Sequence, residues 1–205
     1  MTPKEVVFEG EQSIVPEMES QVSRYYVYGA YGVEGIYTAP AKAVNHAYEI
    51  AGVVVNQLGE CVWLKGNRVT RNQIMAIKKP EVSGKSSLAV CLDTMLGFEG
   101  IVRNSEQLLA QGQNVMEILG DNLEHAQILD LTGCNLDAVL HYVNQDIPVL
   151  ALLENGEAVL VTGFNEFNVV VMDPVEGTLE KRGMNDSAKW FEENGNRFVT
   201  YIRME

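Results

Sequence analysis

The spacing of hydrophobic residues predicts helices in the first half of the segment from residue 83 to residue 204. One apolar face at helical spacing is formed by Leu88, Cys91, Leu92, Met95 and Leu96. Similar patterns predict two short helices within residues 104–133 and a further helix within residues 135–146, which Asn135 is placed to cap. The helical part of this segment therefore precedes its strands.

The pattern then changes to continuous or alternating apolar runs, which are typical of β-strands. These runs are bounded by turn residues and occupy residues 147–153, 157–164, 168–174 and 197–204. A short amphipathic helix is predicted within residues 184–195, before the last run. Helices followed by antiparallel strands favour an α+β domain.

A separate, smaller pattern occupies about residues 23–68. An aromatic, β-rich run breaks into glycines within residues 24–37, and a helix is predicted within residues 38–52. Two short strands around an Asn-Gln-Leu-Gly turn follow within residues 53–66. This β-α-β-β unit is small enough to need a partner surface to complete its core.

These patterns predict three segments. Residues 1–22 are polar and acidic and form a flexible lead-in, residues 23–78 form the small α+β unit, and residues 79–205 form the larger α+β domain. The boundary near residue 78 falls in a linking segment, residues 67–82, that carries most of the local positive charge.

Charge is unevenly distributed along the 205 residues. The formal net charge is −13, with 8 Lys/Arg against 9 Asp/Glu in residues 1–82 and 7 against 19 in residues 83–205. An acidic C-terminal part repels phosphate backbones and anionic membranes, so we expect no nucleic-acid partner.

Hydropathy gives no sign of a segment that enters a membrane. No apolar run approaches the roughly 20 residues that span a bilayer, and the first 20 residues lack the apolar block of a signal peptide. We expect a soluble segment with no direct membrane insertion, either cytoplasmic or excised from an anchored extracellular protein.

The cysteines and histidines offer a limited set of candidate reactive groups. Cys61, Cys91 and Cys134 are too few for a disulfide framework, and no His/Cys cluster has metal-ligand spacing, so no cofactor is expected. Cys134 precedes a helix whose dipole would favour a thiolate, whereas Cys91 belongs to an apolar face. His141, within a helix, is the histidine that would serve either thiol.

Four pieces of the second part follow one another in an informative order. The first is Ser83-Gly84-Lys85-Ser86-Ser87-Leu88-Ala89, which opens a helix, and the second is the helix and strand "LDAVLHYVNQDIPVLALL". The third is "GEAVLVTGF", in which Glu157 opens a strand, and the fourth is "VVVMDP", which ends in Asp173-Pro174. Over about residues 80–204 this order resembles the papain-like cysteine peptidases, particularly the bacterial double-glycine-leader (bacteriocin-processing) type.

The resemblance implies a papain-like domain whose catalytic set is degenerate. The family's nucleophilic cysteine corresponds to Ser83, its histidine to Glu157 and its upstream glutamine to Ile77, while Asp173 matches the family's aspartate. A serine hydroxyl depends on a good base, and a carboxylate is a weak one near neutral pH. We therefore expect no catalytic residue here, with Gly84 and Ile77 beside the former groove.

Three functions stay open on the sequence. The first is a non-catalytic domain that holds a peptide, a protein partner or a small ligand in the former groove, where Glu157 and Asp173, close to Ser83, would favour a cationic group. The second is an active hydrolase that uses Cys134 or Cys91 with His141. The third is a structural or assembly module of a larger bacterial envelope protein, with the N-terminal unit as an adaptor.

Overall fold

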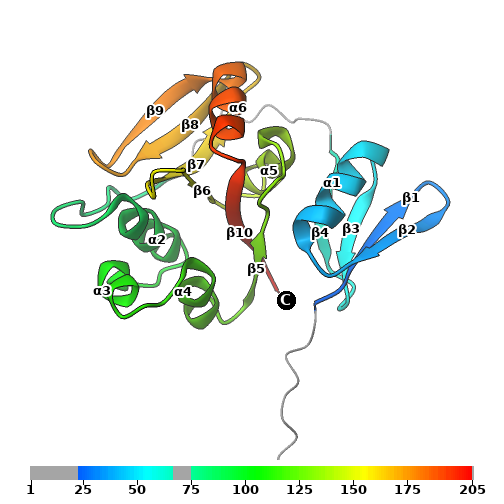
Figure 1. Cartoon of the computed structure of the whole chain (residues 1–205), viewed down its shortest axis with the longest axis horizontal. Helices are drawn as coiled ribbons and strands as arrows, with labels where there is room; N and C mark the ends of the chain where they lie inside the picture. The colour runs from blue at the N-terminus through cyan, green and yellow to red at the C-terminus, as the bar shows by residue number, and fades with distance from the viewer. Residues whose placement is uncertain (1–22, 67–74, 205) are drawn as a thin grey trace, which may run out of the picture.

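The computed structural model describes residues 23–66 and 75–204, which form two antiparallel sheets with helices packed on them (Figure 1). The predicted lead-in over residues 1–22 and the first half of the predicted linker, residues 67–74, lie outside the described residues. Within the described ranges, no helix combines the length and apolar character needed to cross a membrane.

The small N-terminal unit has one strand more than its sequence pattern predicts. Its four strands have the order β2-β1-β3-β4, and α1 connects the two hairpins. The additional strand arises because Gly29 and Gly32 pair at the tip of a tight hairpin that returns the chain along β1. The elements are β1 (Tyr25–Gly29), β2 (Gly32–Tyr37), α1 (Pro40–Ile50), β3 (Val53–Asn56) and β4 (Cys61–Leu64).

One face of this unit packs on the rest of the chain, as its small size predicts. Helix α1 contacts both β5 and α5, and it lies on the side of its sheet that faces the larger part (Figure 1). The Trp63 indole is 2% exposed, and its Nε1 donates to the carbonyl of Ala138 at 2.9 Å. The Tyr48 hydroxyl donates to Asp137 at 2.8 Å. The unit therefore shares one hydrophobic core with the larger part.

The larger part begins with three helices and ends with a six-stranded antiparallel sheet of order β5-β10-β6-β7-β8-β9. The helices are α2 (Ser87–Phe98), α3 (Ser105–Ala110), α4 (Val115–Asn122), α5 (Leu136–Val143) and α6 (Met184–Glu193). The strands are β5 (Ala126–Asp130), β6 (Val149–Leu152), β7 (Ala158–Phe164), β8 (Asn168–Asp173), β9 (Thr178–Gly183) and β10 (Arg197–Arg203). This arrangement confirms the predicted α+β class.

Helices cover both faces of the six-stranded sheet. Along β10, Tyr201 points to the side of α2, where its hydroxyl donates to Glu99. Phe198 points to the opposite side, where its ring packs on Phe191 of α6 at a centroid distance of 5.2 Å. The sheet is therefore the central layer, and β7 is buried along its whole length.

Candidate functional site

The candidate site begins where α2 starts, beside Ser83, the residue that the resemblance aligns with the family's nucleophile. Ser86 is the N-cap, and its Oγ accepts from the backbone N–H of Ala89 at 3.3 Å. Ser83 lies three residues earlier, exposed in a turn with Gly84, whose φ is +69°. Ser83, which the resemblance aligns with the nucleophile, thus lies outside the helix and not in its first turn, where the free N–H groups are.

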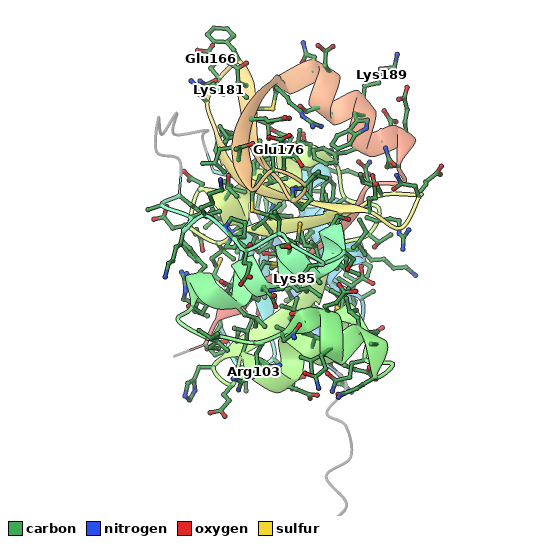
Figure 2. All side chains as sticks on the ribbon, turned by 90° about the vertical axis from the view of Figure 1, so that its left-hand side faces the viewer. Lys85, Arg103, Glu166, Glu176, Lys181 and Lys189 are labelled. Atoms are coloured by element: carbon green, nitrogen blue, oxygen red, sulfur yellow. The ribbon has the colours of Figure 1, made fainter. Side chains whose placement is uncertain are left out.

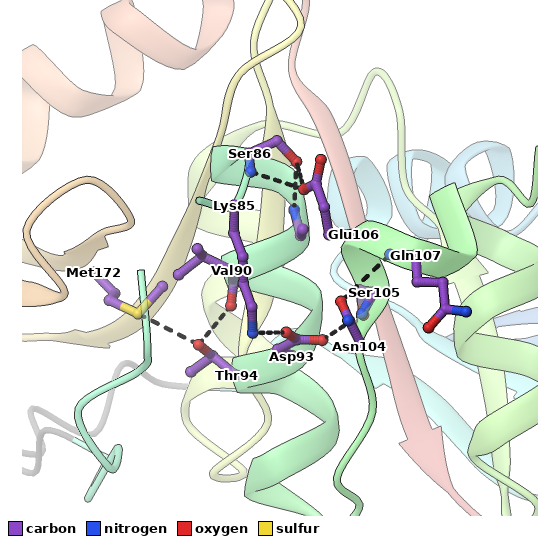
Figure 3. A network of polar contacts seen from close by, with 11 residues as sticks. Lys85, Ser86, Val90, Asp93, Thr94, Asn104, Ser105, Glu106, Gln107 and Met172 are labelled. Carbon is purple, nitrogen blue, oxygen red and sulfur yellow. Dashed lines mark hydrogen bonds and ion pairs between the residues drawn. The ribbon is translucent and has the colours of Figure 1, made fainter. Parts of the chain in front are cut away.

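A carboxylate of the same chain occupies the N-terminus of α2. Glu106, in the first turn of α3, accepts from the backbone N–H of Ser86 at 2.8 Å and from its hydroxyl at 2.7 Å (Figure 3). The pKa of Glu106 lies below its usual range. The main cause is the hydrogen bond from the backbone N–H of Ser86, and the second is the hydrogen bond from the Ser86 hydroxyl. A negative charge of the same chain therefore lies at the positive end of the helix dipole, where a thiolate or an oxyanion would otherwise be stabilised.

An ion pair also fixes the turn before α2 against α2 and α3. The Lys85 ammonium lies 2.7 Å from Asp93, and the other oxygen of Asp93 accepts from the backbone N–H of Ser105 at 2.8 Å (Figure 3). The hydrogen bond to Asp93 raises the pKa of Lys85. The Lys85 charge is thus held in place and compensated inside the protein.

The ends of β7 and β8 lie beside this segment. The Oγ of Ser87 accepts from the backbone N–H of Ala158, the first residue of β7, at 3.0 Å. In the β8–β9 turn, Gly177 packs closely on the segment before α2. A Cβ placed on Gly177 would lie 3.3 Å from Pro80 and 3.4 Å from Val82. Figure 2 shows Lys85 between the turn that carries Glu176 and the loop that carries Arg103. The start of β7 and the β8–β9 turn therefore lie close to residues 80–87.

The two acidic side chains of the predicted site bond to their own turns. Glu157 is exposed and accepts from the Asn155 side chain at 2.8 Å. Asp173 is half-buried and accepts from the backbone N–H of Val175 at 2.8 Å. That these carboxyl groups form one site with Ser83 stays a prediction.

Strand alternation relates the two acids to each other and to α2. Leu160 pairs with Met172, whose sulfur lies 3.7 Å from the Thr94 hydroxyl of α2. Continued along the strands, the same register places Glu157 and Asp173 on one face as diagonal neighbours, and it is the face opposite to Met172. The register thus relates the two acids only to each other, and a contact of either with residue 83 stays a prediction.

Two hollows flank the segment before α2. An open depression of about 430 Å³ is lined by Ser83, Gly84, Lys85, Asn104, Glu106, Gln107 and Ala110. On the other side of Lys85, a groove of about 470 Å³ runs between residues 76–81 and α2. Ile77 lines this groove, so the former-groove residues Ser83, Gly84 and Ile77 all face a hollow. Both volumes are in the range of ligand sites.

The alternative thiol–imidazole set lacks the properties of a catalytic pair. Burial raises the pKa of Cys91 well above its usual range, and the Asp173 charge raises it further. Burial, followed by the Asp130 charge, raises the pKa of Cys134 to about 12. Burial lowers the pKa of His141 to about 4, so this imidazole is uncharged at neutral pH. A thiolate at either cysteine would therefore be strongly disfavoured.

Two of these residues, Cys134 and His141, also have structural contacts. The Cys134 thiol donates to the carbonyl of Ala41 at 3.6 Å, and this contact fastens α1 to the larger part. The His141 ring packs against Trp63 and Tyr142. In the described ranges, no group of three His, Cys, Asp or Glu residues is arranged to hold a metal ion.

Sequence reasoning missed Glu106, Asp93 and the structural use of Lys85. Glu106 follows Ser86 by 20 residues and Asp93 precedes Ser105 by 12, so no local motif relates them. The signal available in the sequence was weak: an acidic residue in the first turn of α3 directly after the cap Asn104.

Comparison with known proteins supports the fold. A crystal structure of a proposed C39-like peptidase from Bacillus anthracis superposes with a TM-score of 0.54 at 14% sequence identity, over 68% of this chain and 100% of that chain. No family model and no curated protein matches the chain. The part of the chain that superposes therefore has a C39-like, papain-like fold, as the sequence resemblance implies.

Proposed function

We propose that the chain is a non-catalytic papain-like domain that holds a peptide, a protein partner or a small ligand beside the start of α2. The observation that carries this proposal is the Glu106 carboxylate on the N-terminus of α2. In a papain-like peptidase that position stabilises the attacking thiolate and the developing negative charge. A resident carboxylate repels both, so the site favours binding over acyl transfer.

The residues around this position favour a cationic ligand. The depression beside Ser83 is lined by the amides of Asn104 and Gln107, by the Glu106 carboxylate and by Lys85, whose charge is already paired with Asp93. Glu157 and Asp173 add two negative charges at the adjacent strand ends, in a part of the chain with 19 Asp/Glu against 7 Lys/Arg. Charge-assisted hydrogen bonds from a Lys or Arg side chain of a peptide would satisfy these acceptors.

Selection from a random peptide library displayed on phage tests this proposal. Selected peptides should carry Lys or Arg, should bind less tightly at higher salt and should emerge intact from incubation with the protein. The variant Ser83→Trp fills the depression and should weaken binding at least about tenfold, by loss of roughly 1.4 kcal/mol or more. Glu166→Trp, on the β7–β8 turn, is the control and should bind as the wild type does.

Two results would contradict the proposal. One is a library that yields no peptide sensitive to Ser83→Trp. The other is a set of bound peptides that the protein cleaves.

A specific observation also favours the assembly role. The N-terminal unit is attached to the larger part by buried contacts of Trp63 and Cys134, while its other sheet face is exposed. An adaptor requires this combination of one fixed face and one available face. Measurement of the oligomeric state, described below, tests this role independently of peptide binding.

A further inference from the structure

The outer face of the N-terminal sheet is an exposed apolar surface. Residues alternate between the two faces of each strand, so Tyr25, Val27 and Val54 point inward and are buried. Their neighbours point outward in register: Tyr26 pairs with Ile36 and Val55, and Tyr28 pairs with Val33 and Val53. We define the outer face by the apolar set Tyr26, Tyr28, Val33, Ile36, Val53, Val55, Cys61 and Leu64.

This surface is large for a small unit and contains no charged side chain. Ile36 is 58% exposed and Val33 is 52% exposed. Seven of the twelve large hydrophobic residues that are exposed in the described ranges belong to residues 23–66. A contiguous apolar patch on a monomer is often a functional surface.

Charge separates this unit from the rest of the chain. Residues 23–66 carry three Lys/Arg and three Asp/Glu, a net charge of zero, whereas residues 75–204 carry nine and nineteen, a net charge of −10. Two copies that approach through their acidic parts repel each other. The neutral outer face is the part through which two copies can meet, and its β1–β2 hairpin projects away from the larger part (Figure 1).

We propose that two copies of the chain associate through their outer faces in a twofold-symmetric dimer. Each apolar face then covers an identical one, as an isologous interface requires. Two sheets stacked about 10 Å apart form a small β-sandwich, with Tyr26, Tyr28 and Ile36 at its centre. The two acidic parts lie at opposite ends of this dimer, where their repulsion is weakest.

The size of the outer face sets the expected affinity. Four strands about 4.8 Å apart and about five residues long, at about 3.3 Å per residue, give a footprint of roughly 300 Å². This is less than the roughly 800 Å² per partner of a standard stable interface. The dimer should therefore be weak and reversible, with a Kd of about 100 μM or higher. High salt should strengthen it by screening the acidic parts.

Sedimentation equilibrium of the full chain under reducing conditions tests the proposal. The average molecular mass of the wild type should rise with concentration, from the 22.7 kDa of the monomer towards twice that mass. Ile36→Lys and, measured in parallel, Val33→Lys should each raise the dimer Kd by at least about tenfold. Val102→Lys is the matched control: Val102 is 86% exposed on the larger part, and this change should leave the Kd unaltered.

Three outcomes would overturn the dimer. The first is a wild type that stays monomeric at several hundred micromolar, which would assign the outer face to a different occupant. The second is a dimer that disappears on reduction, which would indicate a disulfide through the exposed Cys61. The third is a dimer that persists unchanged in both lysine variants while their far-UV circular dichroism matches the wild type.

Discussion

A hydrogen bond between Ser87, the first residue of α2, and the start of β7 connects this helix to the central sheet. Ser87→Ala removes the Oγ that accepts from the backbone N–H of Ala158 at 3.0 Å. Ala158 is 1% exposed, so water cannot readily replace the lost acceptor. A buried donor left without a partner costs about 1–3 kcal/mol.

The expected size of the effect includes a smaller term of opposite sign. Alanine has a helix propensity better than that of serine by about 0.5 kcal/mol, so the net loss of unfolding free energy should be about 0.5–2.5 kcal/mol. For a chain of this length, each kcal/mol lowers Tm by roughly 2–4 °C. Ser83→Ala is the control because Ser83 is exposed in a turn, where a substitution changes stability by about 0.5 kcal/mol at most.

Urea unfolding followed by far-UV circular dichroism measures both variants against the wild type. Ser87→Ala should have a lower unfolding free energy than Ser83→Ala, and its m-value should be unchanged. If the two variants were equally stable, α2 would not depend on this contact with β7, and the arrangement of the site would need another explanation.

Three further predictions concern the same molecule. Trp63→Phe should lower the unfolding free energy by about 1–3 kcal/mol and keep a single urea transition, because it removes the indole hydrogen bond to Ala138 and leaves unfilled the space of a side chain that is 2% exposed; a two-step transition would show that the small unit folds alone. The lowered pKa of Glu106 stabilises the fold at pH values above the unfolded-state pKa of about 4.3, and this contribution disappears as pH falls through the lower folded-state pKa. The unfolding free energy of Glu106→Gln, measured from pH 7 to pH 3, should therefore differ from that of the wild type near neutrality and converge with it in acid. Iodoacetamide at pH 7 should label the exposed Cys61 first, and it should label Cys91 and Cys134 much more slowly than a free thiol. Fast labelling of either buried thiol would favour the alternative function, an active cysteine hydrolase.

The periodic parts of the fold follow from the sequence because burial and periodicity agree there. The apolar face predicted for α2 is buried at Leu92, Met95 and Leu96, and Asn135 caps α5 by accepting from the backbone N–H of Ala138. The strands β6, β7, β8 and β10 appear where continuous apolar runs predict them. These elements have enough apolar contrast for local patterns to decide their structure.

Other elements escaped sequence reasoning because partners distant in the chain create them. Strand β9 (Thr178–Gly183) is mostly polar and forms only because β8 offers an unpaired edge. Strand β5 (Ala126–Asp130) is short and pairs with β10, about 70 residues further along the chain. The site shows the same limit, since the hydrogen bonds of Glu106 and Asp93 connect residues that no linear motif relates.

The central claim, that the site near Ser83 binds without cutting, is tested most directly by a cleavage assay. Purified wild type and Ser83→Ala would be incubated with fluorescently labelled casein, and with any peptide selected for binding, from pH 5 to pH 9. The account predicts no cleavage by the wild type above that of Ser83→Ala at any pH. Turnover by the wild type that Ser83→Ala abolishes would contradict it.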